Sequence, residues 1–266
     1  MARQKSAPKS FLRGSMLDAR TVRTSLSFFG ALLVMIFLNL ILTATFASLS
    51  LAWLRVFFCA AHLAIYYAIA WYSGRSRGTA AVALGETAQS RLDAGKEVTE
   101  AERRLCWHPL KGLASALIGS LPALAIAVIV ALTAQRQSYS PGVLPEWIGG
   151  LRSRPDVTEP LAVYTQGVPA TSSDILRVAV RALIMPYVAL VGSDKFDAVL
   201  ALDRLSPLLV LLPAVFFGAG YLTGPRSRAV VHDTIREGEQ KRKRRELRER
   251  RERQRRREHS EPTQLN

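Results

Sequence analysis

The sequence contains few cysteine and histidine residues and no recognisable catalytic motif or internal repeat. Only two cysteines and four histidines occur among 266 residues, so neither a disulfide framework nor a structural zinc site is expected. Cys59 falls in an apolar stretch and Cys106 in a charged one, which predicts two separate reduced thiols. The sequence therefore predicts no metal and no cofactor, and it specifies no reaction.

Charge is almost absent from residues 25–71. This block contains one charged side chain, Arg55, and one imidazole, His62. A single helix of that length would be about 70 Å long, more than twice the roughly 30 Å hydrocarbon thickness of a bilayer. We therefore predict two membrane-spanning helices, at about 28–47 and 51–71, joined by a short turn.

A basic arm, residues 1–24, precedes this block. A secretory signal sequence likewise begins with a basic region before its apolar run. The apolar run that follows is about 20 residues, longer than the 7–15 of a signal sequence, and a second span follows at once. We expect an uncleaved anchor whose arm is disordered up to the membrane surface.

Two further apolar stretches predict two more spans, at 113–133 and 206–223. The last begins with Ser206-Pro207, the pattern of an N-cap followed by proline at the first helical position. These predicted spans contain no carboxylate, which argues against an ion path through them.

Residues 73–112 are polar and predict a cytoplasmic loop between the second and third spans. Within it, Thr99 and Glu102 match a capping box, which predicts a short helix ending near Leu105. We expect Trp107, close to the next span, to lie at the membrane interface, where tryptophan is common.

Residues 134–205 predict an extracytoplasmic loop rich in proline and glycine in its first half, with Trp147 at the interface. A helix at about 174–191 is a marginal fifth span, because its charge-free part is too short to cross a bilayer. Arg177 and Arg181 share one face of it, and we expect them to extend towards one membrane surface. A short amphipathic helix at about 194–205 should follow.

The distribution of basic residues predicts the topology. Lys and Arg number six in the N-terminal arm, seven in the 73–112 loop and 15 in the tail from Arg226 onward. Basic segments beside spans favour the cytoplasm, and only an even number of spans between each pair places all three there. We therefore predict four spans with both termini cytoplasmic, in a plasma membrane assumed to be the bacterial cytoplasmic membrane; five spans remain the alternative.

The fold class that follows is an all-α integral membrane protein. It has about four transmembrane helices, one or two interfacial or re-entrant amphipathic helices in 174–205, and a highly basic cytoplasmic tail, residues 224–266. Within the first two spans, Asn39 and His62 lie at similar depth, so a hydrogen bond between them is possible. Such a pair either marks a polar site in the membrane or simply joins two helices, and the second interpretation is favoured.

The tail is the strongest functional signal. It has no apolar stripe, so it predicts neither a coiled coil nor a membrane-inserting helix, and glutamates interleave with its arginines at helical spacing. The residues expected to bind an anionic partner are Lys241, Arg242, Lys243, Arg244, Arg245, Arg248, Arg250, Arg251, Arg253, Arg255, Arg256 and Arg257.

Three functional hypotheses follow. The first is a non-enzymatic anchor or accessory subunit whose tail docks acidic lipid, RNA or the ribosome, or an acidic protein. The second is a small oligomeric transporter or channel component that uses kinked helices. The third, an enzyme using Cys106 with His108, or His62, lacks an orienting group, so we expect no enzymatic activity.

Overall fold

The computed structural model describes residues 10–47, 52–134, 156, 172–192 and 195–260. The described part of the chain is helical, and no strand occurs in it. Its helices are α1 (Ala19–Ala47), α2 (Ala52–Asp93), α3 (Glu100–Leu105), α4 (Lys111–Thr133), α7 (Ser172–Leu183), α8 (Met185–Val191), α9 (Phe196–Leu222) and α10 (Gly224–Ser260).

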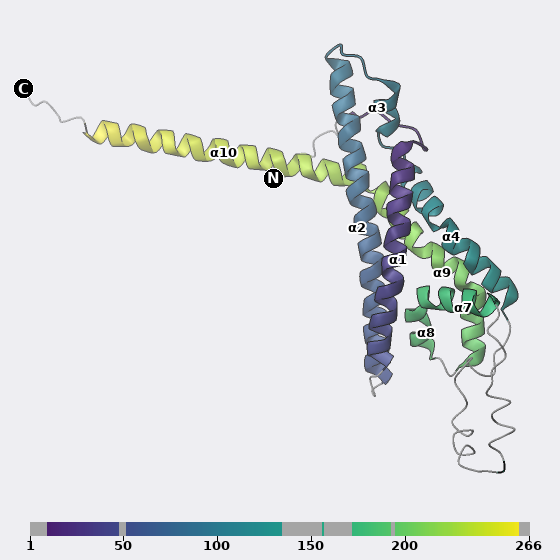
Figure 1. The fold of residues 1–266 in the computed structure, drawn as a ribbon. Coiled ribbons are helices and arrows are strands. Elements are labelled where there is room, and N and C mark those ends of the chain that lie inside the picture. The colour runs from purple at the N-terminus through teal and green to yellow at the C-terminus, as the bar shows by residue number, and fades with distance from the viewer. Residues whose placement is uncertain (1–9, 48–51, 135–155, 157–171, 193–194, 261–266) are drawn as a thin grey trace, which may run out of the picture.

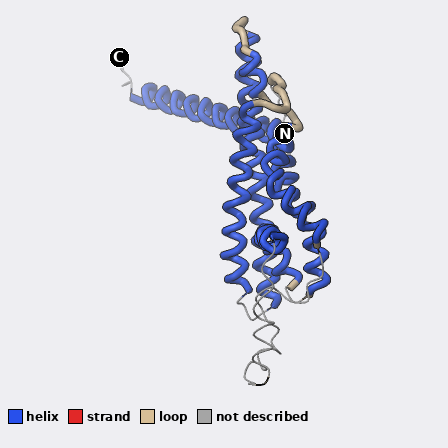
Figure 2. Tube along the Cα trace, turned by 45° about the vertical axis from the view of Figure 1, so that its right-hand side comes forward, coloured by secondary structure: helices blue, strands red, loops and turns tan. Residues whose placement is uncertain are grey.

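Four of these helices, α1, α2, α4 and α9, are long and apolar enough to cross a membrane. They run side by side in alternating directions, and α10 leaves one end of the bundle sideways (Figures 1 and 2). The predicted all-helical architecture with four candidate spans is therefore confirmed, although several predicted boundaries are wrong.

The first helix begins nine residues earlier than predicted, at Ala19 rather than Phe28. Asp18 caps it, since the Thr21 amide donates to Asp18 Oδ1 over 2.7 Å and the Asp18 amide donates to the Thr21 hydroxyl oxygen over 3.2 Å. This reciprocal pair satisfies amide groups that have no partner within the helix. The predicted basic arm is therefore partly helical.

The N-terminal segment before α1 is also ordered where the structure describes it, contrary to the expected disorder. Leu12 donates to the Gly85 carbonyl over 3.2 Å, and Gly14 donates to the Trp107 carbonyl over 3.0 Å. The Phe11 ring packs edge-on against the Trp107 indole. Trp107 is thus buried in this protein contact, and its position at a membrane interface stays a prediction.

Helix α2 continues to Asp93, so the predicted loop at 73–112 is wrong for its first half. The residues after Trp71 include no proline before Pro109, and alanine, leucine and glutamate there favour a helix. The helix ends where Gly95 adopts a φ of 70° and donates to Leu92, while Lys96 donates to Arg91. This is a Schellman motif. The capping box of Thr99 and Glu102 then starts α3 as predicted.

The predicted helices at 194–205 and 206–223 are one continuous helix, α9. Ser206-Pro207 does not start a helix, because Pro207 lies inside α9. Proline has no amide hydrogen for the carbonyl four residues earlier, which is that of Asp203. The Ser206 hydroxyl donates to that carbonyl over 2.8 Å, so the acceptor is satisfied and the helix continues.

The marginal span at 174–191 is broken into α7 and α8, and it is not among the four candidate spans. The break comes at Ile184, just before Pro186. Val180, Ile184 and Val188 are buried in a core with side chains of α4 and α9. The α7–α8 segment therefore packs inside the bundle, between α1 and α2 on one side and α4 and α9 on the other (Figure 1), which fits the re-entrant alternative rather than the interfacial one.

Close packing of α2 against α9 depends on glycine. A Cβ atom at Gly74 would overlap the Phe217 carbonyl oxygen, and one at Gly78 would overlap that of Tyr221. Small residues four apart let two helix backbones approach closely, as in membrane helix pairs. The two helices are therefore fixed in register just where α10 begins.

Candidate functional site

The first candidate site is a polar centre where α1, α2 and the α7–α8 break meet. The Asn39 amide nitrogen donates to the Leu183 carbonyl oxygen over 2.9 Å, and Asn39 Oδ1 lies 2.7 Å from His62 Nε2. The amide of Tyr187 bonds to Ile184, so the Leu183 carbonyl is left for Asn39. Both side chains are buried, with exposed fractions of 3% and 8%.

The bonding pattern fixes the roles of the atoms. Since the Asn39 nitrogen donates to a carbonyl, the oxygen is the atom that faces His62, and it can only accept. His62 Nε2 must therefore carry the hydrogen. The geometry joins three elements through one asparagine, and it brings together the two residues that the sequence placed at similar depth.

The second candidate site is a buried charge cluster centred on Asp203. The carboxylate, 1% exposed, accepts from Arg181 Nη2 over 2.7 Å and from Arg181 Nε over 3.1 Å. Arg177 Nε lies 4.0 Å from Asp203 Oδ2, and Arg177 Nη1 lies 3.7 Å from Asp174 Oδ1. Arg177 Nη2 donates to the Thr133 carbonyl oxygen over 3.3 Å. Ion pairs to Asp203 thus hold α7 against α9, and the hydrogen bond to the Thr133 carbonyl holds it against α4.

This cluster corrects two predictions. Arg177 and Arg181 do not extend towards a membrane surface; they pair with acidic side chains inside the bundle. The candidate span Asp197–Leu222 contains Asp203, so a carboxylate does lie within a candidate span. The sequence signal for it was present, because Asp203 precedes the apolar run directly, but the apparent helix start at Ser206-Pro207 excluded it from the predicted span.

The third candidate site is the basic helix α10. Its base is fixed to α2 by one carboxylate: Glu86 Oε2 accepts from Arg228 and Glu86 Oε1 pairs with His232, both over 2.8 Å. Arg75 donates to the Ser227 hydroxyl over 2.8 Å beside them. We call this group the Glu86 clamp. The 37 residues of α10 extend about 55 Å, so most of the helix projects beyond the clamp.

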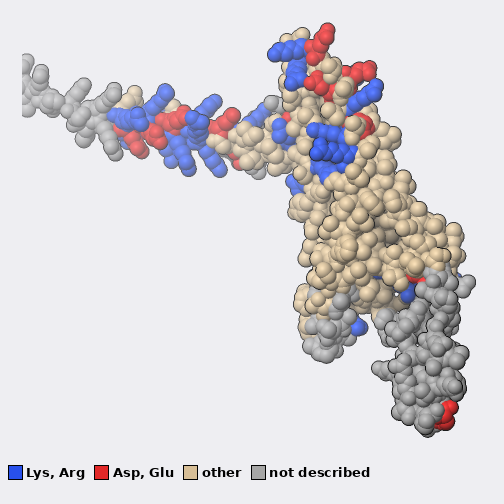
Figure 3. Space-filling view, in the orientation of Figure 1, with Lys and Arg blue, Asp and Glu red and all other residues tan. Residues whose placement is uncertain are grey.

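The outer part of α10 is exposed throughout residues 238–255. Figure 3 shows mixed blue and red side chains along it and at the adjoining end of the bundle, whereas the shaft of the bundle is almost free of charge on this face. Residues 241–257 hold twelve Lys or Arg and three Glu. The predicted anionic-partner residues therefore lie on a solvated helix, among which Arg242 pairs with Glu246 over 3.0 Å.

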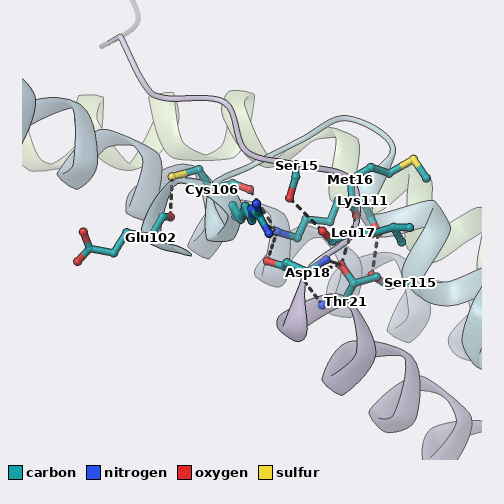
Figure 4. A network of polar contacts seen from close by, with 10 residues as sticks. Ser15, Met16, Leu17, Asp18, Thr21, Glu102, Cys106, Lys111 and Ser115 are labelled. Carbon is teal, nitrogen blue, oxygen red and sulfur yellow. Dashed lines mark hydrogen bonds and ion pairs between the residues drawn. The ribbon is translucent and has the colours of Figure 1, made fainter. Parts of the chain in front are cut away.

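A buried salt bridge links the N-terminal segment to α4 at the same end of the bundle (Figure 4). Lys111 Nζ donates to Asp18 Oδ2 over 2.7 Å, to the Arg104 carbonyl over 2.9 Å and to the Cys106 carbonyl over 3.4 Å. Burial alone would raise the pKa of Asp18, but hydrogen bonds from Lys111 and Thr21 outweigh it, so the pKa lies below its usual value. Lys111 thereby uses all three of its hydrogens.

Cys106 and His108 do not face each other as a nucleophile and base. The Cys106 thiol contacts the Glu102 carbonyl at 3.5 Å, and the His108 ring accepts from the Leu110 amide over 3.3 Å. Burial raises the pKa of the Cys106 thiol, which disfavours a reactive thiolate. Among the described residues, no three His, Cys, Asp or Glu side chains are grouped to hold a metal ion. Trp147 lies outside the described residues.

Comparison of the chain with protein-family models, with curated proteins and with solved structures finds no match. The functional argument therefore depends on the geometry of these sites.

Proposed function

We propose that the chain is a multi-pass membrane protein that holds a basic helical arm, α10, at the cytoplasmic face of the plasma membrane, where the arm docks an anionic partner. The observation that carries this proposal is the Glu86 clamp. A tail that only set the topology would need basic residues near the last span and no fixed base. Here Arg228 and His232 both bind Glu86, so the arm leaves the bundle in one direction.

The grouping of charge supports the cytoplasmic assignment. The N-terminal segment, the outer half of α2, α3 and the base of α10 gather at one end of the bundle (Figures 1 and 3). Basic residues next to spans favour the cytoplasmic side. With four spans, the two ends of the chain lie on that same side.

Affinity purification from mild detergent tests the docking function. The intact chain is compared with a chain ending at Gln240, which keeps Arg228 and His232 and so leaves the Glu86 clamp intact. Each is prepared with and without nuclease. We expect the intact chain to retain anionic lipid, nucleic acid or acidic protein that the shortened chain loses. Identical associated material from both chains would overturn the proposal.

A second candidate function is a component of a small oligomeric transporter or channel, which Asp203 favours. Ionisable residues within spans are costly and often belong to ion or substrate paths. Asp203 and the Asn39–His62 pair supply such groups within the bundle. Proton or ion flux across vesicles containing the purified chain, lost on His62→Phe substitution, would support this function. Vesicles with the intact chain that are no leakier than empty vesicles would exclude it.

A further inference from the structure

The charges on α10 are distributed unequally around the helix. Lys241, Arg244, Arg248, Arg251 and Arg255 follow one another at intervals of three and four residues. Residues so spaced lie along one side of a helix. We call them the basic row. Between residues 241 and 255 one glutamate, Glu252, borders this row, four residues after Arg248 and three before Arg255.

Glu246 and Glu249 lie on another side. Arg242, Glu246, Glu249 and Arg253 follow the same three- and four-residue spacing and form a mixed row, in which Arg242 is paired with Glu246. The mixed row carries no net charge, whereas every member of the basic row is positive. The arm therefore has one side suited to a flat negative surface.

The arm begins at the level where the apolar part of the bundle ends. Gly224 packs directly against Gly78 of α2, about 6 Å past Gly74, where the charge-free part of that helix ends. Beside it, Arg77 binds Ser27 at the start of the charge-free part of α1 over 2.8 Å. Because α10 leaves sideways (Figures 1 and 2), it runs beside the plane in which lipid headgroups of the predicted membrane would lie.

We propose that the basic row of α10 binds the anionic lipid headgroups of the membrane in which the bundle sits, an inference that rests on the proposed docking function. Exposed apolar side chains along the arm fit this partner. Val230 at the base, 59% exposed, lies eleven residues before Lys241 and so on the side of the basic row, and Leu247, 56% exposed, lies between Arg244 and Arg251 on the side without glutamate. Lipid would cover them, whereas the phosphates of a nucleic acid would not.

A fluorophore on the full-length chain can report this contact. Gln254→Cys places a thiol seven residues after Leu247, on the same side of the arm, and the native Cys59 and Cys106 are buried and can stay. The labelled chain is reconstituted into vesicles of phosphatidylcholine alone, or with roughly a third phosphatidylglycerol. Both kinds of vesicle contain a lipid with a nitroxide quencher on its headgroup.

Two matched triple variants separate the rows. One replaces Arg244, Arg248 and Arg251 of the basic row by glutamine; the control replaces Arg242, Arg245 and Arg253 on the side that carries the glutamates. Both lose three arginines from the same exposed segment, so net charge and composition are equal. Charged residues near an anionic surface each contribute roughly fivefold to binding.

We expect strong quenching only in the anionic vesicles, at least tenfold weaker docking for the basic-row variant than for the control, and release when salt is raised from about 0.1 M to 1 M. Equal loss in both variants, or equal quenching in both vesicles, would overturn the lipid assignment. In the second case, binding of a labelled RNA to the chain in phosphatidylcholine vesicles would leave the docking function standing. If the chain binds neither lipid nor RNA, and the chain ending at Gln240 retains the same associated material as the intact chain, both the lipid assignment and the docking function are overturned.

Discussion

At the scale of single residues, Asn39 joins three elements through one amide. It donates to the α7–α8 break and accepts from His62, so each of its polar groups is satisfied away from water. Polar groups that would be costly in an apolar interior become specific contacts when each has a partner. The same rule applies to Ser206, whose hydroxyl takes the place of the amide hydrogen that Pro207 lacks.

A double-mutant cycle tests the Asn39–His62 contact. We expect Asn39→Leu and His62→Leu to be coupled by about 0.6 kcal/mol and by no more than about 1.7 kcal/mol, the range for hydrogen bonds between membrane helices. The measurement is the free energy of unfolding in mixed detergent micelles. Asn39→Leu should cost more than His62→Leu, because it also leaves the Leu183 carbonyl without a donor. Strictly additive effects would contradict the contact.

Asp203→Asn is expected to be the more damaging change. It leaves Arg181 and Arg177 without their shared buried carboxylate, and breaking a buried ion pair costs about 3–5 kcal/mol. The double variant Asp203→Leu with Arg181→Leu should lose less, because no unpaired charge remains at that position and Arg177 keeps Asp174. Both are measured as free energies of unfolding. A double variant less stable than Asp203→Asn would refute the buried pair.

At the scale of whole elements, the register of α2 against α9 depends on glycine, and a matched pair of substitutions tests it. Gly74→Ala should destabilise the chain by about 1–3 kcal/mol, since the new methyl group meets the Phe217 backbone. At Gly30 of α1 nothing lies within 4 Å, so Gly30→Ala should be neutral or stabilising by up to about 1 kcal/mol. Thermal unfolding in detergent compares them. Equal effects would contradict the close approach.

The start of α1 should depend on pH through Asp18. Its pKa is lower in the folded chain than the ordinary value of about 4. The ionised pair with Lys111 therefore stabilises the fold fully above that value, and this contribution is lost as pH falls through the lower folded pKa. Asp18→Asn should lower the unfolding temperature near pH 7 and flatten its acid dependence. An unchanged acid slope would show that other groups control it.

Local patterns predicted some elements correctly and misplaced others for identifiable reasons. The capping box at Thr99 is a short sequence pattern, and the similar depth of Asn39 and His62 follows from counting residues from one turn. Both contacts occur in the structure. Asp203 was missed because Ser206-Pro207 has the local form of a helix start. Whether proline continues a helix depends on a tertiary partner for the freed carbonyl, which no local pattern reveals.

The extension of α2 was missed for a related reason. Its second half is charged, so hydropathy ends the span near Trp71, yet Gly78 and Gly85 pack against α9 and the N-terminal segment and continue the helix there. Likewise, Arg177 and Arg181 were placed at a surface because their partner Asp203 lies 22 or more residues away along the chain.

At the scale of the whole molecule, the proposed topology places Lys195 and Gly238 on opposite sides of the membrane. Both are exposed. In intact cells, a membrane-impermeant thiol reagent should label Lys195→Cys, and it should label Gly238→Cys only after permeabilisation. The buried native cysteines keep the background low. Labelling of both positions from outside would show an even number of crossings between them and refute the arrangement.

The Glu86 clamp gives α10 the mechanics of a lever. The distance from His232 to Ser260 is about 42 Å along the helix, while the clamp consists of Glu86 bound by two side chains and the Arg75–Ser227 hydrogen bond beside them. A rotation of about 10° at this fulcrum displaces the far end by about 7 Å, given a rigid helix. If one of the two bonds to Glu86 is loosened and α10 rotates at the clamp, the displacement of the helix therefore grows along its length and is largest at its C-terminal end.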